Sequence, residues 1–307
     1  MAFKETLTLD PVAPFDFDLT CQIFEVGDLQ IRSYRDGVFC QLLRLGERLV
    51  LANVFSTGTV EQPKLKVELH SEKALSAKTK ATAEQALTYL FNLNFPLTSF
   101  YRQIETDPSM TKIAHQLYGL KNPTTPTVFE ALVDSIVEQQ ISIKVARTIE
   151  ERLCKKFGDK VEIGGQIYFA YPSPQNIKAA CISDIRGVGL SQRKAEYIYG
   201  AAELIADGKL DLEAMKNQQD PQAIIEELDE IKGIGVWTAE LTMLRGMQRL
   251  DALPADDFGI RRVISTYYRG GVSIKAAEAR AIAEAWGKWK GLAAFYLIIA
   301  EVKGVVV

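Results

Sequence analysis

The sequence predicts an α+β protein, with an N-terminal antiparallel β-sheet domain that includes helices, followed by a mostly helical domain. Short apolar runs and period-two alternation are confined to the first part of the chain. From about Pro108 onward, apolar residues recur at helical spacing between glycine-containing breaks. We therefore expect two domains, residues 1–105 and 106–307, in a chain of 307 residues that can bury a substantial core.

Three segments predict the sheet. Residues 38–43 and 48–54 are apolar and flank a Gly-Glu pair, and residues 64–69 alternate between charged and apolar side chains. The alternation predicts a sheet with one face in water. Residues from about 74 to 93 keep roughly helical apolar spacing, so this segment is expected to form a helix that covers the other face.

Proline-containing pairs predict where two later helices begin. Thr125-Pro126 combines a capping hydroxyl with a proline suited to the first helical position, ahead of a helix through residues 129–137. Asp220-Pro221 repeats this arrangement before Ile224. The breaks between other helices contain Gly158, Gly164, Gly165, Gly208, Gly270 and Gly271, besides two Gly-x-Gly sequences.

Composition argues against several classes of protein. The four cysteines lack C-x-x-C spacing, which argues against zinc and against a closely held iron–sulfur cluster. The two histidines, His70 and His115, are too far apart in sequence to suggest a shared metal site. No apolar run approaches the ~20 residues of a membrane span. The N-terminus resembles neither a signal peptide nor a transit sequence. We expect a cytoplasmic protein with reduced, buried thiols and no cofactor.

Residues 228–239, centred on Gly233-Ile234-Gly235, predict two helices joined by a tight hairpin. The glycines allow a sharp turn and a close approach of a ligand to the backbone, while Ile234 is expected to pack inward. Main-chain N–H groups at the start of the second helix then face outward, where the helix dipole also favours an anion. An isolated Gly-x-Gly is usually a plain turn, but the apolar flanks strengthen this prediction. The residues predicted to grip a phosphate are Gly233, Gly235, Val236 and Thr238.

The sequence Gly187-Val188-Gly189 is a looser copy of the same pattern. It is predicted either to contact nucleic acid through Gly187 and Gly189 or to form a simple turn between helices with exposed cations.

The net charge of −3 argues against a nucleic-acid partner, because DNA-binding domains are usually basic. A small footprint, however, needs only a local basic patch. Basic residues in or beside the two Gly-x-Gly sequences are Arg186, Arg193, Lys194, Lys232, Arg245, Arg249, Arg261 and Arg262. The alternative is that these residues form ordinary solvated helix faces.

The hairpin is followed by a proline and by Asp256-Asp257, directly ahead of Phe258-Gly259-Ile260-Arg261. This arrangement resembles the helix–hairpin–helix superfamily of DNA glycosylases, and most of all its 3-methyladenine DNA glycosylase II group. Residues 14–17, 129–142 and 286–296 extend the resemblance over most of the chain. It implies a TATA-binding-protein-like sheet domain and two helical subdomains that flank a cleft. It also implies a monomer that acts on double-stranded DNA with damaged bases, at the nucleoid of the cytoplasm.

The resemblance assigns the essential acid of this family to Asp257. Asp256 is the rival candidate, and an Asp-Asp pair before a helix otherwise suggests N-capping. A carboxylate stabilises the positive charge that develops on deoxyribose as the base departs, and orients the attacking water. The damaged base must first be turned out of the DNA stack into a pocket.

Aromatic side chains are the expected walls of this pocket, because an alkylated base carries positive charge that an aromatic face attracts. The candidates are Trp237, Phe258, Trp286 and Trp289. Ordinary core packing is the alternative for Trp286 and Trp289. Where the family's type member has further pocket aromatics, this chain has Leu241 and Ile298, which predicts a weaker preference for cationic bases.

The residue after the hairpin predicts the reaction subclass. Bifunctional relatives such as 8-oxoguanine glycosylase/lyases carry a lysine there, whereas this chain has Trp237. The resemblance therefore implies a monofunctional glycosylase that excises alkylated purines, of the 3-methyladenine and 7-methylguanine type, and leaves the strand intact. An oxidised-base glycosylase/lyase and a non-catalytic helix–hairpin–helix DNA-binding protein remain as alternatives.

The resemblance also assigns a wedge that fills the gap left by the extruded nucleotide. The wedge segment is Gln139, Gln140 and Ile141, with Gln140 aligned to the wedge side chain and Ile141 as the apolar alternative. A plain polar helix end would explain the same residues. Arg261 is a further expected DNA contact. Family hairpins hold Na⁺ or K⁺ through main-chain carbonyls, which here would be those of Asp229, Ile231 and Ile234.

Overall fold

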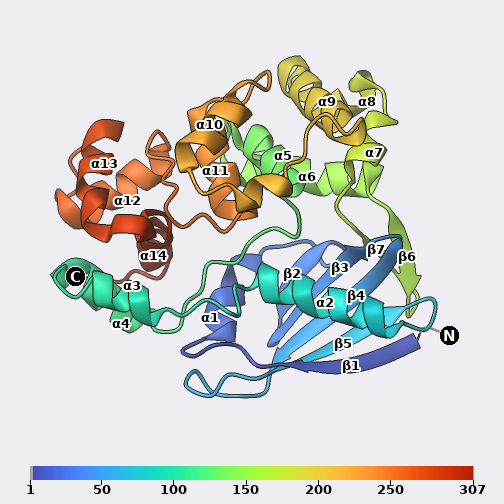
Figure 1. The fold of residues 1–307 in the computed structure, drawn as a ribbon, viewed down its shortest axis with the longest axis horizontal. Coiled ribbons are helices and arrows are strands. Elements are labelled where there is room, and N and C mark those ends of the chain that lie inside the picture. The colour runs from blue at the N-terminus through green and yellow to red at the C-terminus, as the bar shows by residue number, and fades with distance from the viewer. Residues whose placement is uncertain (1–2, 307) are drawn as a thin grey trace.

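The computed structural model describes residues 3–306. Its N-terminal part is a five-stranded antiparallel sheet with strand order β1-β5-β4-β3-β2 (Figure 1). The strands are β1 (Phe3–Leu9), β2 (Arg32–Arg35), β3 (Val38–Leu45), β4 (Arg48–Ser56) and β5 (Leu65–Ser71). Between β1 and β2 lie the short helix α1 (Phe17–Cys21) and the 3-10 turn η1 (Gln22–Phe24). The three predicted strand segments are confirmed as β3, β4 and β5.

Helix α2 (Ala77–Leu90) runs across one face of this sheet, as predicted (Figure 1). Alternate residues of β4, among them Val50 and Val54, are fully buried together with Leu87 and Leu90 of the helix. The Ser76 hydroxyl accepts a hydrogen bond from Thr79 N at 3.1 Å and caps the helix start. The period-two pattern of the strands and the helical period of α2 therefore build one shared core.

The opposite face of the sheet is partly covered by a β-hairpin, β6 (Lys160–Ile163) and β7 (Gln166–Phe169). Leu42 and Leu51 of the sheet pack against Val161 and Ile163 of this hairpin. Two predictions are wrong here: this face is not fully in water, and the chain beyond Pro108 is not helical throughout. The reason is that four-residue strands are too short to leave a clear period in the sequence, so their Gly164-Gly165 turn suggested only a break between helices.

Packing places the domain boundary earlier than the predicted residue 105. Leu93 belongs to the core of the sheet domain, whereas Leu97 belongs to the core of the helical domain. Helices α3 (Thr98–Gln103) and α4 (Pro108–Gln116) lie beside α14 (Lys290–Val302) (Figure 1). The rings of Phe100 and Tyr296 are 5.0 Å apart. Because α3 buries its apolar face against the C-terminal helix, it belongs to the helical domain.

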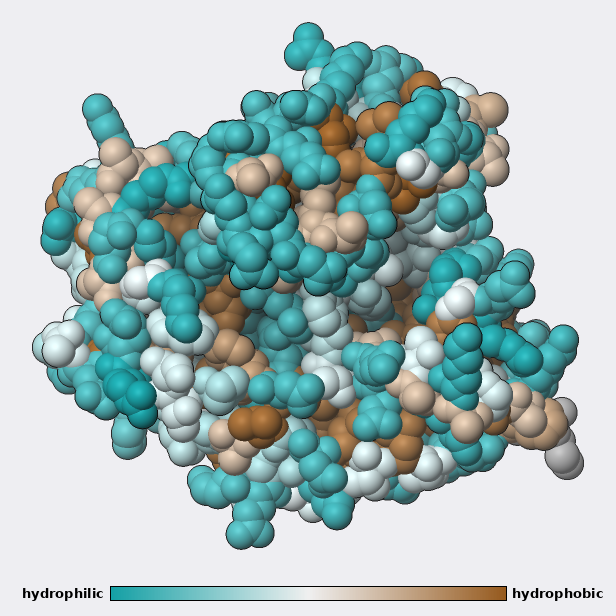
Figure 2. Space-filling model, viewed as in Figure 1, coloured by the Kyte–Doolittle hydropathy of each residue, from teal (hydrophilic) through white to brown (hydrophobic). Residues whose placement is uncertain are grey.

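The helical domain contains two groups of helices (Figure 1). The first group comprises α5 (Val128–Glu138), α6 (Ile143–Phe157), α7 (Pro174–Lys178), α8 (Ile182–Arg186), α9 (Gln192–Ala206), η2 (Ala214–Asn217), α10 (Pro221–Asp229) and α11 (Val236–Gly246). The second group comprises α12 (Phe258–Tyr268), α13 (Ala276–Ala283), η3 (Glu284–Trp289) and α14, together with α3 and α4. Their buried side chains form one continuous apolar core. In Figure 2 the outer helix surfaces are mostly hydrophilic, and hydrophobic side chains show in the hollow between α9 and α10.

The two predicted helix starts have different outcomes. Asp220 caps α10 by accepting a hydrogen bond from Gln222 N at 3.0 Å, as predicted. The predicted start at Thr125-Pro126 is wrong, because Thr127 is the N-cap of α5 and accepts from Glu130 N at 3.1 Å. The Thr125 hydroxyl instead donates to the Thr127 carbonyl, and the helix begins at Val128.

Three of the four cysteines are buried or partly buried, but Cys181 is exposed, so the expectation of buried thiols is wrong at that position. None of the helices in residues 3–306 has the length and apolar character needed to span a membrane.

Lys121 joins the sheet domain to the chain that follows it. Its ammonium donates to the carbonyls of Val12 and Leu93, both at 2.9 Å, and lies 5.2 Å from the centre of the Phe15 ring. The side chain is fully buried, and burial lowers the pKa of Lys121 to about 7.

This burial predicts a pH dependence of stability. Between pH 7 and 10 the unfolded chain, whose lysine pKa is about 10.4, keeps a proton that folded Lys121 has lost, so the contribution of Lys121 to stability rises with pH. The quantity to compare is the unfolding free energy of wild type minus that of Lys121→Met. We expect this difference to increase by on the order of 2 kcal/mol or more between pH 7 and pH 10. Urea unfolding of both proteins at pH 7 and pH 10 measures this difference, which a pH-independent value would contradict.

Candidate active site

The predicted hairpin lies between α10 and α11, and its two glycines serve different purposes. Gly233 has φ +90°, and a Cβ at this position would lie 2.2 Å from the ring of Tyr197 on α9. Gly235 has φ −98°, and its added Cβ would meet no atom within 4 Å. Ile234 is 2% exposed and anchors the turn, as predicted. The fold therefore requires Gly233, whereas Gly235 keeps open the space in front of α11.

The start of α11 is suited to an anion. The first N–H groups of a helix lack acceptors within the helix, and the N-cap Gly235 has no side chain that could supply one. Val236, the first helical residue, is 45% exposed. Thr238 is buried, and its hydroxyl accepts a hydrogen bond from Gln139 Nε2 at 3.0 Å. The Thr238 side chain therefore faces the protein, and the predicted phosphate contact concerns its main chain alone.

The second Gly-x-Gly sequence joins α8 to α9 in a related turn, with Gly189 at φ +118°. Its following helix is capped differently. Ser191 is the N-cap of α9, and its hydroxyl accepts from Lys194 N at 3.3 Å. Because the Ser191 side chain already accepts from Lys194 N, the turn before α9 offers fewer free N–H donors to a phosphate than the turn before α11.

Asp257 stands close to the start of α11. It is the N-cap of α12, where Oδ1 accepts from Ile260 N at 2.9 Å and Oδ2 accepts from the Trp237 indole Nε1 at 3.3 Å. The side chain is half-buried. The rival Asp256 is exposed and lies 3.6 Å from Arg280. Helix capping and a functional carboxylate, which the sequence presented as alternatives, are thus compatible in one residue, and Trp237 connects that residue to the hairpin.

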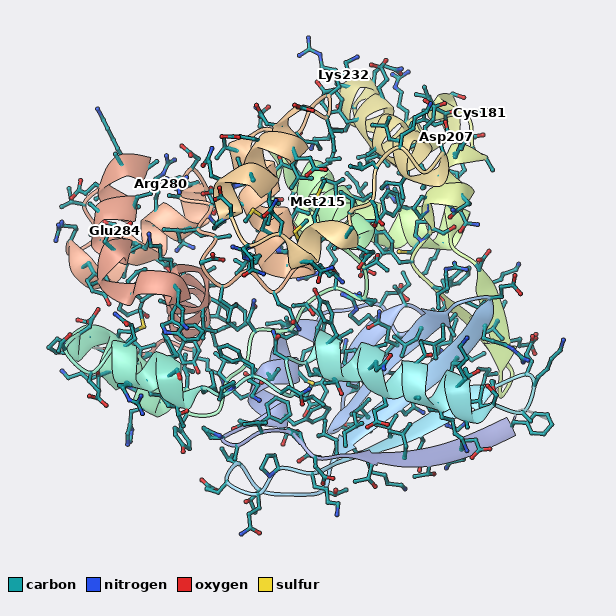
Figure 3. The ribbon with its side chains drawn as sticks, in the orientation of Figure 1. Cys181, Asp207, Met215, Lys232, Arg280 and Glu284 are labelled. Atoms are coloured by element: carbon teal, nitrogen blue, oxygen red, sulfur yellow. The ribbon has the colours of Figure 1, made fainter. Side chains whose placement is uncertain are left out.

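Arg280 of α13, labelled in Figure 3, contacts the loop that precedes Asp257 and holds it in place. Its guanidinium makes two hydrogen bonds to the Glu240 carboxylate, at 2.7 and 3.0 Å, and one to the Leu253 carbonyl at 3.1 Å. Burial raises the pKa of Glu240, and the Arg280 charge opposes that shift. The pair of Arg280 and Glu240 was not predicted from the sequence. Glu240 is the single acid in residues 238–244, and its position among mostly buried residues could have indicated a partner.

Two of the four predicted pocket aromatics belong to the core. Trp286 is fully buried, donates its indole N–H to Asp107 Oδ2 at 3.1 Å and packs edge-on against Tyr268. Trp289 is 8% exposed and packs edge-on against Phe95. Neither ring offers a free face to a ligand, so their prediction as pocket walls is wrong for this structure.

The other two aromatics remain accessible beside Asp257. Phe258 is 73% exposed at the first position of α12, and Trp237 is half-buried at the start of α11.

The predicted wedge segment lies in the loop between α5 and α6. Gln140 is exposed with φ +56°, and Ile141 is 36% exposed. Gln139 is different, because its amide donates to the Gly233 carbonyl at 3.1 Å as well as to Thr238. The prediction of Gln139 as a DNA contact is therefore corrected: its side chain binds the hairpin.

The predicted basic patch is smaller than the sequence suggested. Arg245 pairs with Glu138 at 2.6 Å and Arg249 pairs with Asp251 at 2.8 Å, while Arg262 pairs with Glu301. Lys194 points into the protein. Cationic side chains that remain outward or half-buried near the two turns are Arg186, Arg193, Lys232 and Arg261. Figure 3 labels Lys232 at the tip of the hairpin, where its side chain is 80% exposed.

The carbonyls predicted to hold a monovalent cation are those of Asp229, Ile231 and Ile234, at and after the end of α10. The Ile231 carbonyl already accepts a hydrogen bond from Ile234 N at 3.0 Å. A carbonyl oxygen has a second lone pair, so this hydrogen bond is compatible with a cation at the same atom.

Comparison with known proteins adds to this geometry. The HhH-GPD superfamily of base excision DNA repair proteins matches residues 133–288. The chain is 31% identical over 217 residues to a DNA-3-methyladenine glycosylase from Bacillus subtilis, an alignment that covers 70% of this chain and 71% of that protein.

Solved structures share the fold over nearly the whole chain. A 3-methyladenine DNA glycosylase from Archaeoglobus fulgidus superposes with a TM-score of 0.86 at 26% identity, over 98% of this chain and 100% of that one. An 8-oxoguanine glycosylase/lyase from Clostridium acetobutylicum in complex with DNA has a TM-score of 0.76 at 20% identity, over 99% of both chains. At that identity the second likeness concerns the fold alone.

The two hairpin glycines predict separable effects. Gly233→Ala is expected to lower the unfolding free energy by about 2–4 kcal/mol, because it adds both a left-handed backbone penalty and a clash with Tyr197. Gly235→Ala should change it by less than about 1 kcal/mol, yet weaken binding to DNA about tenfold, since the new methyl group occupies the approach to the N–H groups. Urea unfolding and a DNA-binding titration of both variants test this. Unchanged DNA affinity in Gly235→Ala would show that no phosphate approaches there.

Proposed function

Because the chain belongs to the HhH-GPD superfamily of base excision DNA repair proteins, we propose that it is a monofunctional DNA glycosylase. Its substrates are alkylated purines, of the 3-methyladenine and 7-methylguanine type, in double-stranded DNA. The observation that carries the proposal is the hydrogen bond from Trp237 at the hairpin to the half-buried carboxylate of Asp257. The relatives named as 3-methyladenine glycosylases support the choice of alkylated bases.

The hairpin and Asp257 together suit N-glycosidic bond hydrolysis. A phosphate held at the start of α11 places the next deoxyribose near Asp257, which projects from the start of α12. As the base departs, positive charge grows on the sugar, and the carboxylate stabilises that charge. Its hydrogen bonds to Trp237 and to Ile260 N hold it in one orientation, so little reorganisation accompanies the reaction.

The tryptophan at position 237, directly after the hairpin, supports hydrolysis without strand cleavage. The position that carries the amine in bifunctional relatives is Trp237, and its indole cannot form a Schiff base. Lys232 precedes the glycines, and its ammonium lies 3.7 Å from Glu196 at the exposed tip of the hairpin. An oxidised-base glycosylase/lyase is therefore the less supported alternative.

We further propose where in the cell the protein acts and in which assembly state. The protein acts on DNA as a cytoplasmic, nucleoid-associated monomer, because one chain supplies both the hairpin and the acid. It needs no cofactor for hydrolysis, and a Na⁺ or K⁺ at the carbonyls of Asp229, Ile231 and Ile234 would stabilise the hairpin through main-chain oxygens, which suit hard cations.

A release assay tests the role of Asp257. On methylated duplex DNA we expect Asp257→Asn to release free base at least a hundredfold more slowly, roughly the effect of removing one transition-state charge partner, while it still binds DNA. The matched control Asp256→Asn should lose less than about fivefold, because its exposed ion pair with Arg280 is worth ~1 kcal/mol or less. Equal release by Asp257→Asn and wild type would remove Asp257 from the mechanism.

Borohydride trapping tests the subclass. Because the Trp237 indole cannot form a Schiff base, wild type incubated with substrate DNA and borohydride should form no covalent adduct, and the product strand should stay intact until alkali cleaves it. A trapped protein–DNA adduct would contradict the monofunctional assignment, and its disappearance in Lys232→Met would identify Lys232 as the amine.

A further inference from the structure

The loop between α5 and α6 is tied to the hairpin from one side. Gln139 Nε2 donates to the Gly233 carbonyl at 3.1 Å and to the Thr238 hydroxyl at 3.0 Å. Beyond it, Gln140 and Ile141 are exposed, and Ile143 at the start of α6 is 71% exposed. Exposed apolar side chains thus stand directly beside the turn that is proposed to grip a phosphate.

The same loop is held from the other side by Lys194. This residue lies in the first turn of α9, and its ammonium donates to the Val137 carbonyl at 2.8 Å and to the Gln139 carbonyl at 2.5 Å. Both carbonyls belong to the C-terminal end of α5, where a cation is favourable because the last carbonyls lack partners within the helix. Burial lowers the pKa of Lys194. The two hydrogen bonds direct its ammonium into the protein.

Helix α9 also contacts the hairpin, one turn further along. Tyr197 packs its ring against Gly233 so closely that no Cβ would fit there. Lys194 and Tyr197 are three residues apart and project from neighbouring turns of one helix. A single rigid element thus sets the distance between the α5–α6 loop and the hairpin.

We propose that Lys194 is a positioning residue that holds the α5–α6 loop in register with the hairpin, so that Gln140 and Ile141 enter the duplex while the hairpin holds the backbone. The proposal rests on the proposed function. An extruded nucleotide leaves an unstacked gap, and a side chain can fill it only if its loop is already aligned with the gripped phosphate. Lys194 supplies this alignment through charge-assisted hydrogen bonds to main-chain oxygens, without touching DNA.

The test compares Lys194→Met with Lys209→Met, which removes an exposed cation that pairs with Asp207 after the end of α9. We expect Lys194→Met to release 7-methylguanine opposite cytosine about tenfold more slowly or worse, as for a misplaced positioning group. Opposite an abasic analogue, where little pairing must be broken, the loss should stay below about threefold. Lys194→Arg should restore part of the activity. Equal loss on both substrates would overturn the proposal.

Salt dependence separates loop positioning from phosphate binding. For unmodified duplex, Lys194→Met should keep the wild-type slope of log Kd against log salt, whereas loss of a phosphate contact reduces that slope by about 0.9. If Lys194→Met shows that reduction, Lys194 binds DNA and the proposal is wrong. Thermal unfolding of each variant confirms that the measured chains are folded.

A fluorescent duplex tests the role of Lys194 in loop insertion without requiring base excision. With 2-aminopurine beside an abasic analogue, insertion of the loop should raise the fluorescence in wild type and in Lys209→Met, and Lys194→Met should lose at least about half of that rise at saturating protein. The absence of any rise in wild type, or an undiminished rise in Lys194→Met, would refute the role of Lys194. If wild type releases no methylated base, the proposed function fails, and the fluorescence result still decides the role of Lys194.

Discussion

The hydrogen bond between the Trp237 indole and Asp257 is the contact on which the site depends. Trp237 belongs to the first turn of α11, directly after the hairpin, and Asp257 caps α12. The bond therefore links the place where a phosphate would be held to the acid that would act on the attached sugar. The brace formed by Arg280, Glu240 and the Leu253 carbonyl holds the intervening loop from its other side. Two helix starts and one half-buried ion pair thus keep a single carboxylate in place.

A net charge of −3 is compatible with DNA binding because the proposed grip uses main-chain dipoles. Gly235 leaves the N–H groups of α11 without a capping side chain, whereas Ser191 caps the otherwise similar turn before α9. Several of the basic residues near these turns are neutralised by acids, as Arg245 is by Glu138. The proposed attraction for a phosphate therefore comes from one helix start and a few nearby cations, which the net charge of the chain does not reflect.

Local features of the sequence were sufficient for much of the fold. The strand segments follow from period-two alternation, α2 follows from its helical spacing, and the hairpin follows from Gly233 and Gly235. Each of these elements depends on residues within a few positions of one another, so the local sequence pattern is enough to predict it. The hairpin β6–β7 was missed because its short strands are stabilised by distant partners, Leu42 and Leu51, that no local pattern reveals.

The sequence by itself determined the division into a sheet part and a mainly helical part, the two glycines of the turn and the carboxylate that follows, because these are properties of neighbouring residues. Only the tertiary structure decided the direction of long side chains. Trp237 reaches Asp257 while Trp286 is enclosed by Asp107 and Tyr268, although both are tryptophans near helix ends. Lys194 turns inward to helix carbonyls while Lys232 extends outward. The physical reason is that the environment of a side chain comes from segments far away along the chain, which meet only when the core has formed.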